Sequence, residues 1–297
     1  MCERGKNLLI PTLVCLGLTL PLFNAGAANW YRRFDNGIKR FLLSGVDTSY
    51  VGLPRTSWEI PTALTVYGES QNMILSGGRE VRLNSGAVAE AGIGIGYHGL
   101  DYVQYFSLTQ NLFAGHFEFN FYDNAWGFQL INSDYRYTAL GIGASELTLS
   151  GYIALNGSKY SYPAVYYGNY IQKKSAGSPI IYFWYDQTTN YSLEPAEDVD
   201  EDVKNIRNVA ICAGYGYSWA FNKGKTILNA SGSVGFIAPY WGVATEFRAT
   251  AMHWFNDNLR INLAAVQYFS TGKRQLVEPY FVDRWMFTLS LAYCFGK

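Results

Sequence analysis

The last part of the chain shows the clearest alternation of apolar and small or polar side chains. From Arg284 to Phe295 every odd-numbered residue is large and apolar, and most even-numbered residues are small or polar. A period of two is typical of a β-strand with two different faces, and this length matches a strand that crosses a bilayer at a tilt. The pattern therefore predicts a membrane-spanning strand in this part of the chain.

Consecutive stretches before this strand carry the same pattern, with one bulky face and one face rich in glycine, serine and alanine. They lie at 209–221, 228–236, 243–251 and 259–269. A β-sandwich would also alternate, but its buried face would rarely oppose a face of such small residues. The alternation therefore favours a barrel whose bulky side chains meet lipid.

Strands are also expected earlier in the chain. Ala87 to Tyr97 alternates cleanly, and a later strand closes at Asn156-Gly157, a strong hairpin signal. Further strands are expected near 58–76, 101–109, 113–122, 126–137, 147–155, 159–168 and 178–187. Because 86–122 divides in two ways and the number of strands must be even, we expect about twelve, within roughly ten to fourteen. The predicted fold is all-β, a transmembrane antiparallel up-and-down β-barrel.

The beginning of the chain has the features of a signal peptide. Arg4 and Lys6 supply a basic region, Leu8 to Leu22 is apolar, and Ala25-Gly26-Ala27 is a small-residue cleavage site. Export followed by cleavage near Ala27 is therefore expected. The predicted organisation is a signal peptide over 1–27, a periplasmic lead-in over 28–56 and an outer-membrane barrel over 57–297.

The composition fits this class of protein. The chain is 17% aromatic and 15% charged, with a mean hydropathy of −0.04, whereas soluble domains carry roughly 25% charged residues. Hydropathy this low excludes a bundle of membrane helices, and balanced charge gives no reason to expect nucleic acid. The sequence has no phosphate-binding glycine loop, CxxC pair or metal-spaced cysteine and histidine set, so no cofactor is expected.

Several charged residues fall on the strand face that points to the lumen. They are Glu90, Glu246, Arg248, Arg260 and Arg284. Charges in a narrow lumen must pair, because burying an isolated charge costs several kcal/mol. They form either a salt-bridge plug or the charge-selective constriction of a narrow channel, and a lumen filled by side chains favours the plug.

Loop lengths predict the orientation of the barrel. Outer-membrane barrels have short periplasmic turns, longer outer loops and usually both termini in the periplasm. The short turns at 222–225 and 255–258 are therefore expected in the periplasm, and the longer loops at 188–207 and 270–283 outside.

The run Q-K-K-S-A-G-S is the most distinctive polar element. Lys173, Lys174, Ser175 and Ser178 could contact an anion or a lipid phosphate, since ammonium groups and clustered amides suit such ligands. The simpler alternative, which we favour, is a tight turn with Gly177 at positive φ.

The acidic loop that begins at Glu194 is a second polar element. Asp198, Asp200 and Asp202 are spaced like the ligands of a calcium loop. The turn glycine and the closing glutamate of such a loop are missing, which favours a solvated outer loop. The functional alternative is a divalent cation that bridges to lipopolysaccharide.

Some barrels act on lipids with a serine and histidine pair at the outer rim. His116 shares the lumen face with Glu118, but no serine or acid stands at a recognisable motif spacing. A structural histidine is therefore favoured over a catalytic one.

The block Asn156 to Pro179, N-G-S-K-Y-S-Y-P-A-V-Y-Y-G-N-Y-I-Q-K-K-S-A-G-S-P, resembles the signature of an uncharacterised outer-membrane protein family from Gram-negative gut bacteria. Val46 to Pro54 and Ala213 to Trp219 resemble other landmarks of that family in the same order. The resemblance implies a barrel with a shared structural plan. It implies no catalytic residues, because the family has no established activity.

We therefore expect an integral outer-membrane β-barrel with a structural or binding role, or one that acts as a narrow charge-lined channel. The alternative function is an outer-leaflet lipid-modifying enzyme. The expected partners are outer-membrane lipid, lipopolysaccharide and the barrel-assembly machinery, which recognises a final strand that ends in an aromatic residue such as Phe295.

Overall fold

A computed structural model describes residues 25–75, 79–109, 115–137, 142–192, 205–238, 242–274 and 278–296. The chain divides into two compact units, Met1–Ser44 and Gly45–Lys297. In the first unit, helix α2 (Ala25–Leu42) carries an ion pair between Lys39 and Asp35, with Nζ and Oδ2 2.7 Å apart. Among the described residues, no helix is both long and apolar enough to cross a membrane.

The predicted signal peptide lies outside the described residues, except for its last three positions, which begin α2. Cleavage near Ala27 therefore stays a prediction. The predicted boundary between lead-in and barrel at 56/57 also stays a prediction, and the structure places residues from Gly45 onward in the same unit as the strands.

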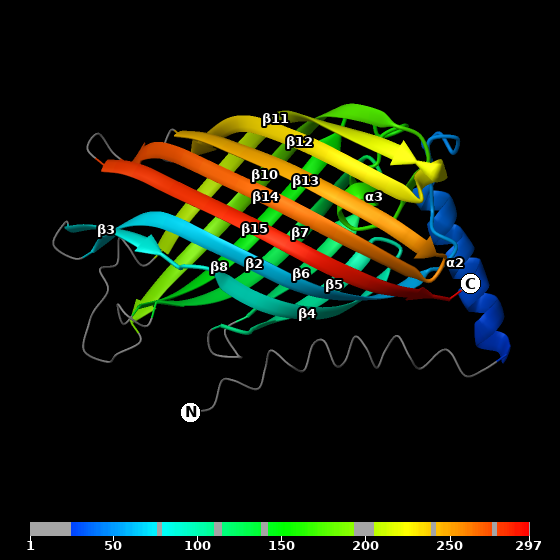
Figure 1. The fold of residues 1–297 in the computed structure, drawn as a ribbon, viewed down its shortest axis with the longest axis horizontal. Helices are drawn as coiled ribbons and strands as arrows, with labels where there is room; N and C mark the ends of the chain where they lie inside the picture. The colour runs from blue at the N-terminus through cyan, green and yellow to red at the C-terminus, as the bar shows by residue number, and fades with distance from the viewer. Residues whose placement is uncertain are drawn as a thin grey trace. The chain divides into compact units, whose positions relative to one another are not determined.

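The second unit is a closed antiparallel barrel (Figure 1). Its strands are β2 (Trp58–Leu75), β3 (Arg79–Asn84), β4 (Val88–Tyr97), β5 (Leu100–Ser107), β6 (His116–Tyr122), β7 (Trp126–Tyr137), β8 (Ile142–Ala154), β10 (Ala176–Ser192), β11 (Asn205–Phe221), β12 (Thr226–Ala238), β13 (Gly242–Asn256), β14 (Leu259–Arg274) and β15 (Glu278–Phe295). Each pairs with its neighbours, and β15 closes the barrel on β2.

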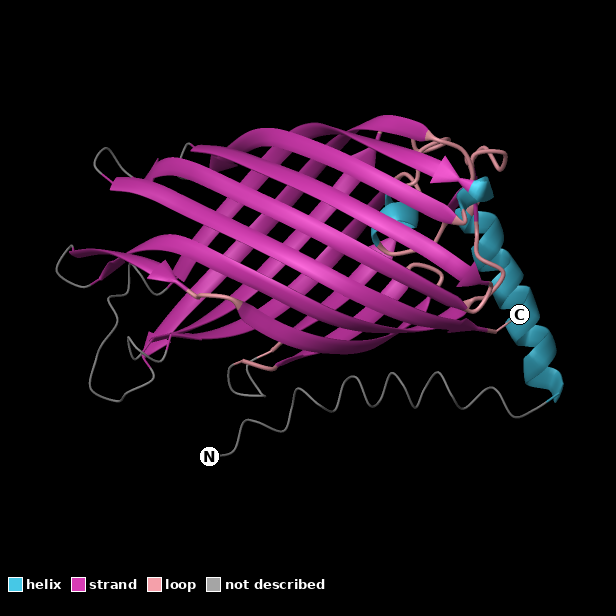
Figure 2. Ribbon diagram, in the orientation of Figure 1, coloured by secondary structure: helices cyan, strands magenta, loops and turns pink. Residues whose placement is uncertain are grey.

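The described strands occupy twelve positions round the barrel, because β3 and β4 pair in succession with the same strand, β2. The predicted all-β, up-and-down antiparallel architecture with about twelve strands is confirmed (Figure 2). The predicted outer loop at 270–283 is wrong in its extent. Strands β14 and β15 continue as a pair up to Arg274 and Glu278, so most of these residues belong to the wall.

Side-chain exposure follows the predicted alternation. The bulky residues Ile211 on β11, Phe236 on β12 and Phe247 on β13 are exposed. Cys212 on β11 and Ala244 on β13 have the opposite parity and are buried. An outer surface of large apolar side chains would be costly in water and is stable against lipid. A closed barrel pairs neighbouring strands all the way round, so that backbone hydrogen bonds are made within the wall. With such a surface, this is a transmembrane β-barrel.

Replacing Leu289 by arginine is expected to lower the free energy of unfolding by about 2–4 kcal/mol, the cost of a lipid-facing cation near the bilayer midplane. Leu289 is exposed in the middle region of β15, where it pairs with Leu263 and Leu64. Urea unfolding in phospholipid vesicles measures the change, with Leu289→Phe as the matched apolar control. Equal stabilities for the two variants would contradict a lipid-facing position.

The connection between β8 and β10 departs from the simple wall. The alternation predicts a strand at 159–168, but this prediction is wrong. Residues 156–175, which we call the inward segment, contain the short helix α3 (Tyr162–Tyr166) and strand β9 (Ile171–Gln172). Figure 1 shows α3 inside one end of the barrel.

Local sequence explains why this segment is not a wall strand. The Ser161 hydroxyl caps α3 by accepting a hydrogen bond from Ala164 N, and Pro163 stands in the first turn. Proline suits that position and cannot donate to a strand ladder. Gly168 then takes a positive φ of 74°, which turns the chain after the helix.

Candidate functional site

The inward segment is bonded to opposite walls of the barrel. Tyr166 Oη donates to Asn229 Oδ1 on β12 at 2.7 Å, and Asn169 Nδ2 donates to Asp101 Oδ2 on β5 at 2.7 Å. Strands β5 and β12 are six positions apart in either direction round the twelve, so they face each other. Asn262 Nδ2 on β14 also donates to Tyr166 O at 3.1 Å. The segment therefore crosses the lumen.

Tyrosine rings fill the lumen at this level. Tyr167 stacks on Tyr122 of β6 with ring centroids 3.9 Å apart, and Tyr162 packs on Tyr152 of β8 at 4.1 Å. Tyr160 and Tyr170 are completely buried. Large aromatic rings in contact leave little room between the inward segment and the wall at this end of the barrel.

Residues 47–52, which precede the first wall strand, also bind the inward segment. Strand β1 (Val51–Gly52) pairs with β9, and Lys173 N donates to Tyr50 O at 2.6 Å. Asp47 N donates to Ser158 O at 2.8 Å. Hydrogen bonds donated by Ser49 hold the pKa of Asp47 below its usual value, so this carboxylate stays charged.

The candidate anion-binding residues take part in these attachments. Lys173 Nζ donates to Thr48 O at 2.8 Å, and Lys174 Nζ lies 4.9 Å from the centroid of the Tyr50 ring. The other two are Ser175, whose Oγ accepts from Ala220 N at 3.0 Å, and Ser178, whose Oγ donates to Pro179 O at 2.7 Å. The predicted positive φ at Gly177 is wrong, because this residue is extended in β10 opposite Tyr217.

The candidate lumen charges point inward and are paired. The pairs are Arg248 with Glu246 (2.6 Å), Arg260 with Glu59 (2.6 Å), Arg284 with Glu69 (2.7 Å) and Glu146 (3.1 Å), and His116 with Glu90 (2.7 Å) and Glu118 (3.4 Å). Short ion pairs between mostly buried groups offset the cost of desolvating each group.

Arg284 forms a second crossing of the lumen. It belongs to β15, and Glu146 belongs to β8, which is again six positions away in either direction. Glu69 on the adjacent strand β2 holds the same guanidinium. One arginine therefore links two facing walls through charge-assisted hydrogen bonds.

The sequence interpretation missed several acidic partners. Glu146 has the same parity as Thr148 and Ser150, opposite to the exposed Leu147 and Leu149, so the alternation of β8 contains its position. Glu59 and Glu69 stand ten residues apart on β2, also with one parity. The mixed pattern of β2 hides which of its faces is the inner one.

Glu59 and Asp101 meet over a glycine. Gly96 of β4 is opposite Glu59 on one side and opposite Asp101 on the other. A Cβ atom at position 96 would come within 3.1 Å of Glu59 Oε1 and closer still to Asp101 Oδ1. Because glycine has no side chain, the carboxyl groups of Glu59 and Asp101 can both approach the space that a side chain at position 96 would fill.

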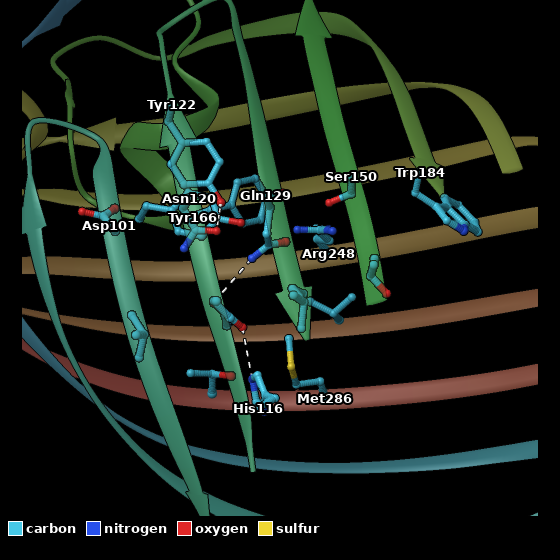
Figure 3. Close-up of a pocket in the computed structure, with 18 of the residues that line it drawn as sticks. Asp101, His116, Asn120, Tyr122, Gln129, Ser150, Tyr166, Trp184, Arg248 and Met286 are labelled. Carbon is cyan, nitrogen blue, oxygen red and sulfur yellow. Dashed lines mark hydrogen bonds and ion pairs between the residues drawn. The ribbon is translucent and has the colours of Figure 1, made fainter. Parts of the chain in front are cut away.

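A cavity of about 320 Å³ lies among these groups. Tyr166, Tyr167 and Arg260 line it beside the inward segment, and Arg284 and Glu146 line it at the second crossing. Figure 3 shows inward-pointing side chains from several strands, among them Asp101, His116 and Arg248. The arrangement is a polar, tyrosine-lined chamber between two crossings of the lumen.

Replacing Gly168 by alanine is expected to destabilise the inward segment. A non-glycine residue at positive φ costs about 1–2 kcal/mol, and here the new Cβ would also strike the Arg260 guanidinium. Gly86 is the matched control, since its φ is 66° but nothing lies near its Cβ. Unfolding free energies in vesicles are expected to fall more for Gly168→Ala than for Gly86→Ala. Equal losses would mean that the contact with Arg260 is unimportant.

The remaining candidates are placed differently. Asp198, Asp200 and Asp202 lie outside the described residues, among which no group of three or more metal-ligating side chains is found. His116 is stacked on Tyr105 at 4.1 Å and held between Glu90 and Glu118 in the interior. A lipid-modifying enzyme would instead need its histidine at the outer rim.

The chain is similar to several solved barrel structures. An outer membrane channel from Pseudomonas putida F1 shares 11% identity, with 83% of this chain and 98% of that chain covered and a TM-score of 0.38. The translocator domain of the autotransporter NalP from Neisseria meningitidis shares 8% identity, with 91% and 97% covered and a TM-score of 0.38. The KdgM porin shares 7% identity, with 79% and 99% covered and a TM-score of 0.34.

No curated protein matches the chain in sequence. Residues 101–293 match a protein family described as a domain of unknown function, DUF4421. This match spans most of the barrel, from the start of β5 into β15, and includes the whole inward segment. The chain therefore belongs to the DUF4421 family.

Proposed function

We propose that this outer-membrane barrel is a plugged passage, in which the inward segment closes the lumen and a solute passes only when that segment is displaced. One observation carries the proposal: the segment hydrogen-bonds to β12 through Tyr166 and to the facing strand β5 through Asn169.

The way the inward segment is attached supports displacement. Its strand β9 pairs with β1, not with a wall strand, and its contacts with the wall are side-chain bonds and ring packing. Breaking such contacts leaves the wall hydrogen bonds between strands intact. Local opening of this kind costs less free energy than unfolding the barrel.

We also propose how the protein is exported and what surrounds the barrel. A basic region followed by an apolar run supports a signal peptide that is cleaved near Ala27. Outer-membrane lipid and lipopolysaccharide are the proposed surroundings, and the barrel-assembly machinery is the proposed partner during insertion. We assign the block from Asn156 to Pro179 as the sequence signature of the inward segment in this family, because the whole segment falls within the block.

Liposome swelling tests the proposal. The variant lacks residues 159–174 and joins Ser158 to Ser175, which leaves β8 and β10 connected by a short hairpin. Vesicles with the wild-type protein are expected to swell in isotonic arabinose no faster than protein-free vesicles, and vesicles with the variant are expected to swell rapidly. A heat-modifiable gel shift reports that both barrels are folded. Equal swelling by the two folded proteins would refute the plug.

A further inference from the structure

The described interior of the barrel contains more acidic than basic side chains. Eight carboxylates line the cavity or pair with its lining: Glu59, Glu69, Glu90, Asp101, Glu118, Glu146, Asp186 and Glu246. Three guanidiniums do so, those of Arg248, Arg260 and Arg284. Even a charged His116 would leave four carboxylates without a matching cation. A low-dielectric chamber with this imbalance attracts cations and repels anions.

Two buried oxygen acceptors in this chamber have no hydrogen-bond partner among the described residues. Asp101 is 5% exposed, and its Oδ2 accepts from Asn169 while its Oδ1 accepts from nothing. Asn262 is 7% exposed, and its Nδ2 donates to Tyr166 O while its Oδ1 accepts from nothing. Both side chains line the cavity. Buried acceptors are rarely left unpaired, so their open lone pairs indicate a ligand that donates hydrogen bonds.

The Arg260 guanidinium is the nearby group that could attract an anion instead. Its Nε lacks an acceptor among the described residues, but its other nitrogens are already held by Glu59 and by the carbonyl oxygen of Tyr167. An anion bound at Arg260 would lie against Glu59 and Asp101. The surrounding charge therefore disfavours an anionic ligand at this place.

Tyrosine rings also line the chamber and offer aromatic faces to a ligand. Tyr105, Tyr122, Tyr166 and Tyr167 line the same cavity. The Arg248 guanidinium already lies 5.5 Å from the centroid of the Tyr166 ring, so a ring of this chamber faces a cation in the protein itself. Carboxylates combined with aromatic faces recognise organic ammonium groups. A cavity of about 320 Å³ is within the usual size of small-molecule sites.

We propose that the chamber binds a small organic cation with an ammonium group, which donates hydrogen bonds to Asp101 Oδ1 and Asn262 Oδ1 and packs against the tyrosine rings. This inference rests on the proposed function only in naming the solute of the passage. Binding in the chamber requires no displacement of the inward segment, so it is measured independently of permeation.

Isothermal titration calorimetry on the full-length barrel refolded in detergent tests the inference. The probes are butylammonium chloride, 1-butanol and sodium butyrate, which share one carbon chain and differ in charge. Each probe is added before refolding in one series and after refolding in another, so that a slow route into the chamber is not mistaken for a missing site. Only butylammonium is expected to bind, and potassium chloride at the same concentration is expected not to displace it.

The variants identify the residues involved. Asp101→Asn keeps the side-chain shape and is expected to raise the Kd for butylammonium at least tenfold, and Asn262→Leu is expected to act in the same direction. Asp257→Asn is the matched control, because Asp257 lies in the turn between β13 and β14 and pairs with Arg55. Butyrate or butanol binding as tightly as butylammonium would overturn the inference. So would full competition by potassium, or an unchanged Kd for folded Asp101→Asn. The outcome of this binding test does not depend on whether the vesicles swell.

Discussion

Replacing Arg260 by leucine is expected to lower the free energy of unfolding by about 3–5 kcal/mol, the cost of leaving a buried partner without its counter-ion. The side chains of Arg260 and Glu59 are only 6% and 11% exposed, and Nη2 and Oε2 are 2.6 Å apart. The same guanidinium donates to Tyr167 O of the inward segment. The substitution therefore removes one contact within the wall and one contact between the wall and the inward segment.

Urea unfolding of the barrel in vesicles measures this loss. Arg55→Leu is the matched control, since Arg55 forms an ion pair of similar length with Asp257 on the exposed surface, and such pairs contribute about 0–1 kcal/mol. Adding Glu59→Gln to Arg260→Leu is expected to restore part of the stability, because it removes the uncompensated carboxylate. An Arg260→Leu barrel as stable as Arg55→Leu would contradict a structural role for this pair.

Replacing Arg284 by leucine is expected to cost about 3 kcal/mol, the lower part of the range for broken buried pairs, because the guanidinium itself is partly exposed to the cavity. Two buried carboxylates, Glu69 and Glu146, would lose their cation together. The connection between the facing strands β15 and β8 would also be lost.

Arg284→Lys separates charge from geometry in this second crossing. Lysine keeps the positive charge but offers no planar fork for two carboxylates at once. Its unfolding free energy is expected to fall between those of the wild type and Arg284→Leu. If Arg284→Leu unfolds at the wild-type urea concentration, the crossing is not a stabilising element.

The strands were predictable because the lipid-facing side chains of a barrel repeat every second residue. In β11 and β15 this period is nearly uninterrupted, so their existence and inner faces follow from local sequence. The same rule failed at 159–168. Tyr160 and Tyr162 are two residues apart, like the bulky residues of a wall strand. Both are instead buried in the interior of the barrel, where aromatic residues fill space.

The partners of the lumen charges were less predictable for a topological reason. Parity places Arg260 and Arg284 in the lumen, but it does not say which acid lies opposite. Glu59 on β2 is 201 residues from Arg260 on β14. The two residues meet only because β15, the neighbour of β14, closes the barrel on β2. Gly96, whose missing side chain brings Glu59 and Asp101 together, looks like any other glycine of a strand.

Planar-bilayer conductance tests most directly whether the inward segment closes the lumen. The wild-type barrel and the variant without residues 159–174 are inserted at matched amounts and recorded in the same salt solution. The wild type is expected to stay at the lipid baseline, and the variant is expected to carry a steady ohmic current. A steady ohmic current of the same size through both folded proteins would show that the inward segment does not close the lumen.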